Sequence, residues 1–217
     1  MILFMVMVCL VLFGSVWADP EQGYAWPMKA KPALTSTFGE YRSGGRLHTA
    51  IDLKTWGKEG FPVVAVDDGY VWRVRTSPWG FGRAVYIKLR DGRFAVYAHL
   101  SGFSEQIKPF VEAEQERRET YSVNLFFEEG QIPVRREETV GFSGSTGIGV
   151  PHMHFEIRDA KNRAMNPLKQ GFAVVDTHPP TLKSVALIPL DVDSSVRGFH
   201  EPYVMGLHWN EKRGTYQ

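Results

Sequence analysis

Cysteine is almost absent from this sequence. Of the 217 residues only Cys9 carries a thiol, and it lies in an apolar segment at the N-terminus. A single cysteine cannot form an internal disulfide, which excludes the small disulfide-stapled scaffolds that are common among secreted proteins. It also means that any metal site beyond that segment must use His, Asp or Glu as ligands.

A surplus of one charge is also missing. The chain has 25 Lys and Arg residues and 24 Asp and Glu residues, for a formal net charge of +1 with neutral His. This balance gives no electrostatic reason to expect nucleic acid as a partner. Hydrophobic residues make up 43% and charged residues 23%, which is typical of a globular protein and argues against wholesale disorder. The length accommodates one good-sized domain, or one domain plus a piece of another.

The only long apolar run covers residues 1–13. Short residues follow it, and we therefore interpret residues 1–18 as a signal peptide that is cleaved before Asp19. Because no Lys or Arg precedes the run, an uncleaved membrane anchor is the alternative, and it would be the only membrane tether. Val8 stands before Cys9 where a lipoprotein signal needs a small residue, which argues against a lipid anchor. We expect export to the periplasm, the cell envelope or the extracellular space.

Short strands and tight turns dominate the sequence from residue 61 to residue 100. Alternating runs are separated by turn residues, including the two-residue hairpin signal Asp91-Gly92. This pattern predicts an all-β domain, built as an antiparallel sheet or sandwich. Residues 104–120 are the exception, since their Glu, Gln and Arg content and apolar spacing predict one inserted helix, weakened near its start by Pro109.

The composition changes after residue 173. Residues 174–180 end in two prolines and have the character of a linker. Residues 181–217 alternate apolar and polar positions at first, which is typical of the first strands of a second β-domain that is cut short. We therefore predict a signal peptide at 1–18, a main domain at 19–173, and a linker with the truncated start of a C-terminal β-domain at 174–217.

Two histidines, His152 and His154, stand two apart in a run with the pattern of a β-strand. Residues at that spacing point to the same face of a strand, so Met153 and Phe155 should face a core and Glu156 should share the histidine face. Imidazole is the commonest metal ligand and the commonest general base near neutral pH. Taken alone, the pair also fits a polar and solvated strand face.

Three further polar residues, His48, Asp52 and His99, fall in two other β-segments. The spacing of His48 and Asp52 keeps both on one face of an extended chain. Two His and one Asp form a ligand set that suits zinc with an open fourth position. The other two histidines of the group would then be free to move protons, and this division of labour is what metal-assisted hydrolysis requires.

Four short segments carry these residues in a characteristic order. They are Gly-Arg-Leu-His-Thr-Ala-Ile-Asp at 45–52, Tyr-Ala-His-Leu-Ser at 97–101, Ser-Gly-Ser-Thr-Gly at 143–147 and Pro-His-Met-His-Phe-Glu at 151–156. Together they resemble the motifs of the M23 family of zinc metallopeptidases, the lysostaphin and LytM type. The resemblance covers residues 26–172 and implies a lysostaphin-like antiparallel β fold for a zinc peptidase domain at 19–173.

The resemblance also implies specific roles. The family's zinc ligands correspond to His48, Asp52 and His154, which would hold one Zn²⁺ per chain. The catalytic pair corresponds to His99 and His152, of which one is a general base and the other stabilises or protonates the tetrahedral intermediate. The implied activity is that of a monomeric zinc metalloendopeptidase that cleaves peptide cross-links in bacterial peptidoglycan.

The chain departs from the family pattern at three places. Ala50 stands where the family usually has Gly, and residues 135–138 replace a turn that usually contains Gly. The helix predicted at 104–121 is an insertion relative to the shortest members, and we expect it to border the substrate groove. None of these departures removes a metal ligand.

Two other functions compete with this hypothesis. One is a non-catalytic member that binds peptidoglycan or activates an amidase, but such proteins typically lose zinc ligands, and none is lost here. The other is a metallopeptidase that acts on proteins, which the sequence does not distinguish. The sequence also leaves open whether the bond cleaved joins D-Ala to diaminopimelate, lies in a glycine bridge, or lies in a stem peptide.

Several residues near the motifs have two interpretations. Glu156 either accepts a hydrogen bond from a ligand imidazole or pairs with Arg158 on the same face. The aromatic residues Trp72, Trp79 and Phe81 either belong to the core or line a sugar-binding groove.

Other polar residues are also ambiguous. Arg42 and Arg46 either meet acidic groups on a substrate or lie in a solvated loop. The remaining histidines, His178 in the predicted linker and His200 and His208 in the tail, are interpreted as structural or solvent-facing.

Overall fold

A computed structural model describes residues 23–42, 45–172, 174–175 and 181–217 of the chain. It divides into two compact units, Met1–Val174 and Val175–Gln217, each of which is described by itself. The predicted signal peptide, with Cys9, and the linker histidine His178 lie outside the described residues. Among the residues that are described, no helix is both long and apolar enough to cross a membrane.

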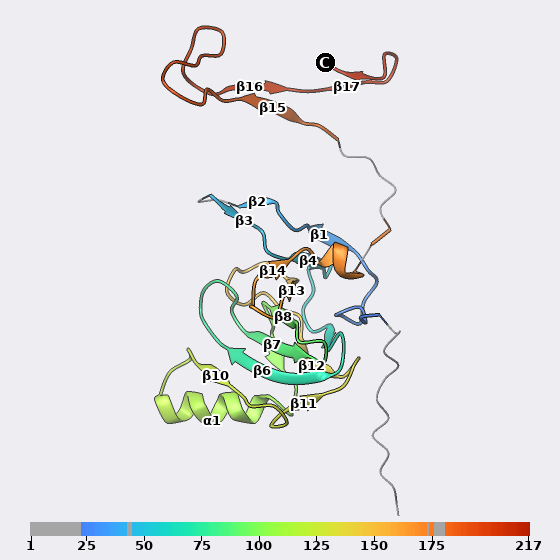
Figure 1. Ribbon diagram of the computed structural model, residues 1–217, viewed down its shortest axis with the longest axis vertical. Helices are drawn as coiled ribbons and strands as arrows, with labels where there is room; N and C mark the ends of the chain where they lie inside the picture. The colour runs from blue at the N-terminus through green and yellow to red at the C-terminus, as the bar shows by residue number, and fades with distance from the viewer. Residues whose placement is uncertain (1–22, 43–44, 173, 176–180) are drawn as a thin grey trace, which may run out of the picture. The chain divides into compact units, whose positions relative to one another are not determined.

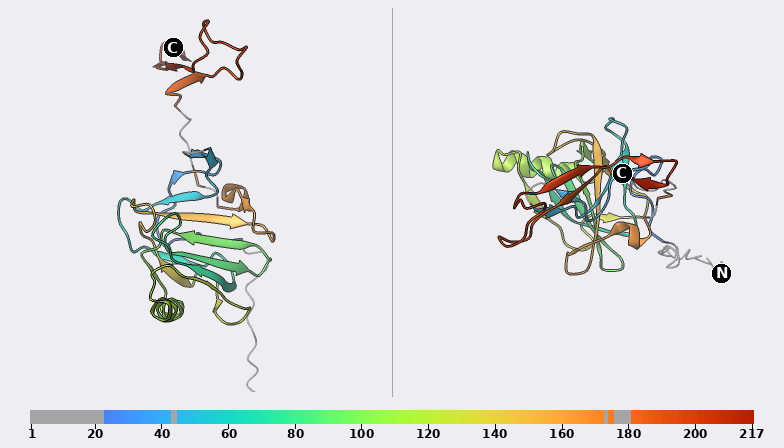
Figure 2. Two further views of the ribbon diagram at one scale, coloured as in Figure 1. Left: turned by 90° about the vertical axis from the view of Figure 1, so that its left-hand side faces the viewer. Right: turned by 90° about the horizontal axis from the view of Figure 1, so that it is seen from above.

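A nine-stranded sheet forms the centre of the first unit (Figure 1). Its main path runs in the order β1 (Leu34–Ser36), β4 (Ile51–Lys54), β13 (His152–Arg158), β8 (Phe94–Ala98), β7 (Ala84–Leu89), β6 (Gly69–Arg75) and β10 (Asn124–Phe126). Two short strands complete it, β11 (Pro133–Val134) beside β6 and β14 (Ala164–Met165) beside β13. All these pairings are antiparallel, and Figure 2 shows the neighbouring strands stacked in this order.

Smaller elements surround this sheet. A three-stranded sheet contains β5 (Pro62–Val64), β12 (Thr139–Phe142) and β9 (Gly102–Phe103), and β2 (Tyr41–Arg42) pairs with β3 (Arg46–Leu47). The 3₁₀ helix η1 (Pro167–Gln170) follows β14. The mostly antiparallel β architecture confirms the predicted fold class.

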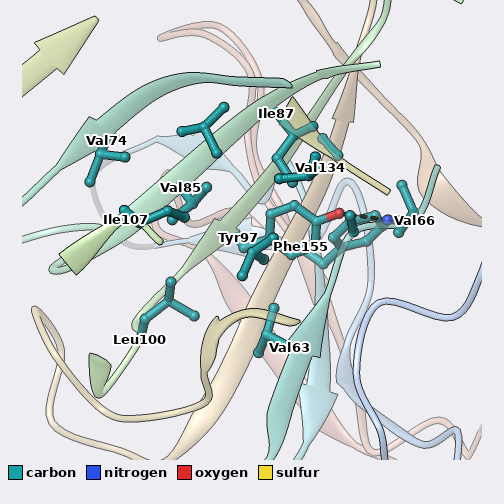
Figure 3. Packing of buried hydrophobic residues seen from close by; sticks show 14 of the residues in the cluster. Val63, Val66, Val74, Val85, Ile87, Tyr97, Leu100, Ile107, Val134 and Phe155 are labelled. Atoms are coloured by element: carbon teal, nitrogen blue, oxygen red, sulfur yellow. Dashed lines mark hydrogen bonds between the residues drawn. The ribbon is translucent and has the colours of Figure 1, made fainter. Parts of the chain in front are cut away.

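One face of the central sheet packs into the main hydrophobic core. Met153 and Phe155 of β13 are both fully buried there, as the alternation of the strand predicts. The Tyr97 hydroxyl lies in the same core and accepts a hydrogen bond of 3.0 Å from the backbone N–H of Val66 (Figure 3). This bond satisfies a polar group that would otherwise be costly to bury. The other face of β13 is therefore the one that carries the histidines.

The single α-helix among the described residues is α1 (Lys108–Arg118). It confirms the helix predicted at 104–120, but the expectation that Pro109 weakens it is wrong. Pro109 lies in the first turn, where a backbone N–H has no partner within the helix and the fixed φ of proline is favourable. The helix ends at Glu119, which takes a left-handed conformation and donates its N–H to the last turn.

The second unit contains two small antiparallel sheets. One pairs β15 (Ser184–Leu187) with β16 (Tyr203–Gly206), and the other pairs β17 (Trp209–Asn210) with β18 (Thr215–Tyr216). Several large hydrophobic side chains are exposed on this unit: Leu182, Ile188, Leu190, Val192, Phe199, Val204 and Trp209. His200 and His208 are also exposed, which agrees with their interpretation as solvent-facing residues.

Candidate metal centre

Strand β13 brings the predicted ligands together at the middle of the sheet. His154 pairs directly with Asp52 of β4 on one side and with Ala98 of β8 on the other. Because Met153 and Phe155 fill the core, His154 and Asp52 both project from the opposite face. They are buried there, each with only 6% of its surface exposed.

His48 reaches the same place from the segment just before β4. Two backbone hydrogen bonds of 2.8 Å hold this segment, from His48 N–H to Glu40 O and from Gly39 N–H to His48 O. The ring of His48 lies edge-on to the ring of His154, with 5.1 Å between their centroids. Residues separated by 106 positions in the chain therefore become neighbours.

Three atoms form a nearly equilateral triangle. His48 Nε2 lies 3.1 Å from Asp52 Oδ1, His154 Nδ1 lies 3.2 Å from the same oxygen, and the two nitrogens are 3.3 Å apart. Two ligands bound about 2.0–2.1 Å from a tetrahedral zinc ion are separated by about 3.3–3.4 Å. The triangle therefore has the dimensions of three corners of a zinc tetrahedron, and the cluster could hold a metal ion.

Asp52 gives an independent sign that a cation belongs here. Its Oδ2 accepts a hydrogen bond of 2.9 Å from Arg42 Nη2, whereas the buried Oδ1 has no hydrogen-bond partner of acceptable geometry. A buried carboxylate oxygen without a partner is costly, and a metal ion would satisfy it. Burial by itself raises the pKa of Asp52, but the contacts with His154 and His48 outweigh burial and hold the pKa well below its usual range.

The hydrogen bonds of the two imidazoles decide which nitrogens face the centre. His48 Nδ1 lies 2.8 Å from the carbonyl oxygen of Thr37, and His154 Nε2 lies 2.9 Å from Glu156 Oε1. Both partners can only accept, so these two nitrogens carry the protons. The nitrogen left on each ring is the one in the triangle, and its lone pair can bind a metal.

Glu156 holds His154 in place. It is fully buried and accepts hydrogen bonds from His154 Nε2, from Thr49 Oγ1 at 2.6 Å and from Arg158 Nε. The two interpretations of Glu156 are therefore both correct, since one oxygen orients the imidazole while the other pairs with Arg158. Burial raises the pKa of Glu156, but His154 and Arg158 outweigh burial and leave the pKa below its usual value.

His99 and His152 lie beside the triangle without belonging to it. Their ring centroids are 4.7 Å apart, and His152 Nε2 lies 3.8 Å from Asp52 Oδ1. The Nδ1 of His99 is 2.9 Å from the carbonyl of Thr146, and the Nδ1 of His152 is 2.8 Å from the carbonyl of Val150. Each Nδ1 is thus a donor, which leaves both Nε2 atoms able to accept a proton.

Burial makes His99 a neutral base. It follows the end of β8 and takes the left-handed conformation, with φ of 61°. Burial lowers the pKa of His99 to about 4, with further lowering from His154 and His152. The ring is therefore uncharged near neutral pH, as a general base must be.

The glycine-rich loop at 143–147 holds His99 in position. A Cβ on Gly144 would lie 2.4 Å from the backbone nitrogen of Ser101 and 2.8 Å from the carbonyl oxygen of His99. Only glycine allows the two segments to approach so closely. Thr146 Oγ1 then donates a hydrogen bond of 2.8 Å to the carbonyl of Leu100, so the loop that orients the imidazole is bonded to the segment that carries it.

The remaining predictions around the site had mixed outcomes. Arg42 pairs with Asp52, which neither of its interpretations anticipated, whereas Arg46 is exposed. Trp79 is 78% exposed and is not a core residue. Trp72 and Phe81 are half-buried against a second, smaller cluster on the histidine face, and so lie outside the main core. The exposure of Arg46 agrees with its interpretation as a residue of a solvated loop. The pairing of Arg42 with Asp52 depends on the folded chain and has no signal in the local sequence.

The inserted helix lines a cavity near the segment that carries His99. Lys108, Val111 and Gln115 of α1 line a cavity of about 290 Å³ together with Arg83 and Ser101. Ser101 is two residues beyond His99, so the cavity is close to that segment along the chain. The prediction that the helix borders the substrate groove stays a prediction.

No family model matches the chain. Among curated proteins, it is 33% identical over 156 residues to an uncharacterized metalloprotease of Haemophilus influenzae, covering 68% of this chain and 27% of that protein. It is 34% identical over 124 residues to the DD-carboxypeptidase/endopeptidase Mpg of Neisseria meningitidis, covering 57% of this chain and 22% of that protein. It is also 27% identical over 152 residues to the murein hydrolase activator NlpD of Escherichia coli, covering 70% of this chain and 32% of that protein.

Among solved structures, the pore-forming complex of SpoIIQ and SpoIIIAH contains a similar chain. The likeness has a TM-score of 0.51 and 26% identity and covers 68% of this chain and 90% of that one. The chain spans only between 22% and 32% of the length of the curated relatives named above. The similarity is thus confined to one part of those larger proteins.

Proposed function

Because the chain belongs to the M23 family of metallopeptidases, we propose that it is a zinc-dependent endopeptidase that hydrolyses peptide cross-links in bacterial peptidoglycan. The observation that carries this proposal is the triangle of His48 Nε2, Asp52 Oδ1 and His154 Nδ1, whose buried oxygen lacks a hydrogen-bond partner. Two more imidazoles, His99 and His152, lie beside it, each with its Nδ1 held by a backbone carbonyl oxygen. A metal-binding triangle with two adjacent bases is the arrangement that metal-assisted hydrolysis needs.

His48, Asp52 and His154 would hold the ion. Two imidazoles and one carboxylate favour zinc over magnesium or calcium, which prefer oxygen ligands alone. Zinc bound to three protein ligands supplies a Lewis acid that polarises a carbonyl group and lowers the pKa of a water molecule to about 7. Glu156 and the carbonyl of Thr37 would keep the two imidazoles oriented toward the ion.

His99 and His152 would handle the protons. The carbonyl oxygens of Thr146 and Val150 fix the proton of each ring on Nδ1, so each Nε2 can accept a proton from the attacking water. The same nitrogen, once protonated, can stabilise negative charge on the substrate oxygen or donate the proton to the leaving amine. Burial of His99 favours the neutral form that must start this sequence.

The non-catalytic alternative is less favoured. A relative named as a murein hydrolase activator is 27% identical to this chain, so an activator role has a precedent among similar proteins. This chain keeps all five polar residues of the proposed site, however, and a protein that only binds has no need of a triangle with a destabilising, unpartnered oxygen. A metallopeptidase that acts on proteins would use the same residues and differs only in substrate.

The proposal extends to the bounds of the domain, its export and its oligomeric state. We place the peptidase domain at residues 19–173 and propose that residues 1–18 direct export to the cell envelope, where peptidoglycan lies. We further propose that the domain acts as a monomer with one zinc ion, because all five residues of the site come from one chain.

Digestion of purified peptidoglycan tests the proposal. The zinc-loaded protein is incubated with sacculi of several cell-wall types, and the released fragments are identified by mass spectrometry. We expect cross-linked fragments to be cut at one kind of peptide bond, which also identifies the bond. The same protein treated with a chelator serves as the control. Release of no fragment from any wall type by protein with stoichiometric zinc would contradict the proposal.

A further inference from the structure

Strand β6 contains an extra residue on the side of the sheet that carries the histidines. Its pairing with β7 shifts register between Val71 and Arg73, which leaves Trp72 as the residue of a β-bulge. Val71 and Val74 are both fully buried in the main core. The bulge thus lets two successive side chains, Trp72 and Arg73, project from the opposite face, which strict alternation would not allow.

The two side chains form a compact aromatic and cationic unit. The Trp72 ring lies 5.3 Å from the ring of Phe126, and the guanidinium of Arg73 lies 4.9 Å from the ring of Tyr86 and 5.2 Å from that of Phe126. Arg73 Nε donates a hydrogen bond of 2.7 Å to Asn124 Oδ1. Among the described residues, the two terminal nitrogens of Arg73 have no hydrogen-bond partner, although the guanidinium is fixed in place by the rings.

Other cations surround this unit. Arg158 of β13 lies 5.7 Å from the Tyr86 ring, and Lys88 of β7 lies 5.1 Å from the ring of Phe94. Burial raises the pKa of Tyr86, while the nearby charges of Arg73 and Arg158 act in the opposite direction. We call the set Trp72, Arg73, Lys88, Phe126 and Arg158 the cationic platform.

The carboxylates near the platform do not pair with Arg73 among the described residues. Glu156 is fully buried, and it already accepts hydrogen bonds from His154 and Arg158. Glu128 and Glu129 lie beside the platform, since after burial their charges raise the pKa of Tyr70, which pairs with Lys88 in the sheet. No carboxylate is paired with Arg73 in the described part of the chain, so the positive charge of its guanidinium is available to a ligand.

The platform is continuous with the metal centre. Arg158 contacts Glu156, which in turn holds His154. Phe81 lies between the two regions, since its ring is 5.0 Å from that of His154 and it packs on the same small cluster as Trp72. An extended ligand that leaves the metal centre over Phe81 would therefore meet the platform.

The separation can be estimated from strand geometry. Strands β13, β8, β7 and β6 are successive neighbours (Figure 2), and Arg73 lies in the row of Glu156 across them. Three steps of about 4.8 Å, with an offset of two residues along β13, place Arg73 about 16 Å from His154. An extended peptide covers this distance in about four or five residues.

We propose that the cationic platform binds a carboxylate of an acidic peptide substrate, about four or five residues from the bond that is cleaved. This proposal rests on the proposed endopeptidase function and names a determinant of its specificity. The planar guanidinium of Arg73 offers two parallel donors that match a carboxylate, and its stacking on aromatic rings reduces the entropy lost when they bind. Peptides whose carboxylate at this position is amidated should therefore be poorer substrates.

Matched substrates test the platform in the zinc-loaded full chain. One synthetic cross-linked peptide carries a free carboxylate at the chosen position, and its partner carries the amide. We expect amidation to raise KM about tenfold with little change in kcat, because a charge-assisted hydrogen bond is lost at a site remote from the chemistry. Arg73→Gln should bring the two KM values together. Arg73→Lys keeps the charge but loses the two parallel donors, so it should keep only part of the preference.

The control is Arg117→Gln on α1, which removes an exposed cation that pairs with Glu114. It should leave the preference unchanged, which separates a local effect from a change in net charge. Equal KM values for both peptides in the unsubstituted protein would overturn the proposal. An equal loss on both peptides in Arg73→Gln would also overturn it, because that pattern indicates a structural role. A preference that follows attached sugars and ignores the carboxylate would assign the platform to glycan.

Failure of the proposed endopeptidase function can be distinguished from failure of the platform proposal. In that case neither peptide is hydrolysed by protein that contains stoichiometric zinc. Isothermal titration of the two peptides then still decides the question, since a tenfold difference in Kd that disappears in Arg73→Gln supports the platform. The same Kd for both peptides overturns it.

Discussion

The two faces of strand β13 have different roles, one in the hydrophobic core and one in the polar site. Met153, Phe155 and Ile157 lie on one face and are fully buried among other hydrophobic side chains. His154 and Glu156 lie on the other face, where each polar atom is directed at a named partner. The inner face stabilises the fold through hydrophobic burial, which depends on the apolar area removed from water and not on the orientation of each side chain. The outer face depends on geometry, and its buried Asp52 oxygen is even left without a hydrogen bond.

This contrast predicts that substitutions on the two faces can be separated experimentally. Changes on the outer face should affect metal binding and turnover more than the free energy of unfolding. Changes on the inner face should affect the free energy of unfolding more than metal binding and turnover. The following predictions test that separation, beginning with the largest expected effect.

His154→Ala should abolish stoichiometric zinc binding and reduce peptide hydrolysis to background. The substitution removes one corner of the triangle and leaves Glu156 without its imidazole partner. Metal analysis after dialysis measures the first effect, and circular dichroism shows whether the β fold persists. Retention of one zinc ion per chain would show that the ligand assignment is wrong.

His99→Asn should retain zinc but lower kcat by about 10²- to 10⁴-fold, the usual contribution of a general base. Asn is chosen because it tolerates the left-handed φ of 61° at this position better than Ala does. Single-turnover kinetics and metal analysis on the same sample measure the two properties. Full activity in this variant would remove His99 from the mechanism.

Phe155→Ala should act on stability. The side chain is fully buried and packs at steep ring angles against Tyr97 and Phe172, with ring centroids 5.4 Å and 4.8 Å away. Its removal should lower the free energy of unfolding by about 3–5 kcal/mol, through lost burial and the cavity that remains. Urea unfolding measures the change, and the folded fraction should still bind zinc. Loss of zinc from the folded protein would break the separation of the two faces.

Gly144→Ala should disturb residues 99–101, because its Cβ would lie 2.4 Å from a backbone atom of Ser101. We expect destabilisation of about 1–3 kcal/mol, as for overpacking elsewhere, together with reduced kcat. Gly102→Ala is the matched control, since its nearest contact would be an ordinary 4.0 Å from Phe142. Similar effects in both variants would mean that the close approach of the loop is unimportant.

Glu156→Gln should weaken zinc binding about 10- to 100-fold, which is the usual cost of removing a partner that orients a ligand. The amide keeps the size of the side chain, but it places a donor against His154 or against Arg158. Competition with a chromogenic chelator measures the affinity. An unchanged affinity would show that the orientation of His154 does not depend on this carboxylate.

The sequence could predict much of the site because strand alternation is a local property. Two histidines two residues apart must share a face, and the apolar residues between them must fill the other. The antiparallel architecture was predictable for the same reason, from alternating runs and turn residues. Pro109 was misjudged because its effect depends on its position within the helix, and that boundary is poorly defined by local composition.

The tertiary structure decided what no local pattern contains. The acceptors that fix the tautomers of His48, His99 and His152 are backbone carbonyls, which every residue possesses and which leave no mark in the sequence. Arg42 of β2 meets Asp52 of β4 although the two strands do not pair, which no local pattern predicts.

Residue types and their spacing thus determined by themselves which chemistry the chain could perform, and on which face of which strands. Only the folded chain decided which nitrogen of each ring faces the metal centre. Only the folded chain, too, placed a bulge that turns Trp72 and Arg73 to the same face. The physical reason is that alternation is a property of one strand, whereas hydrogen-bond partners and register shifts depend on how the folded segments pack against one another.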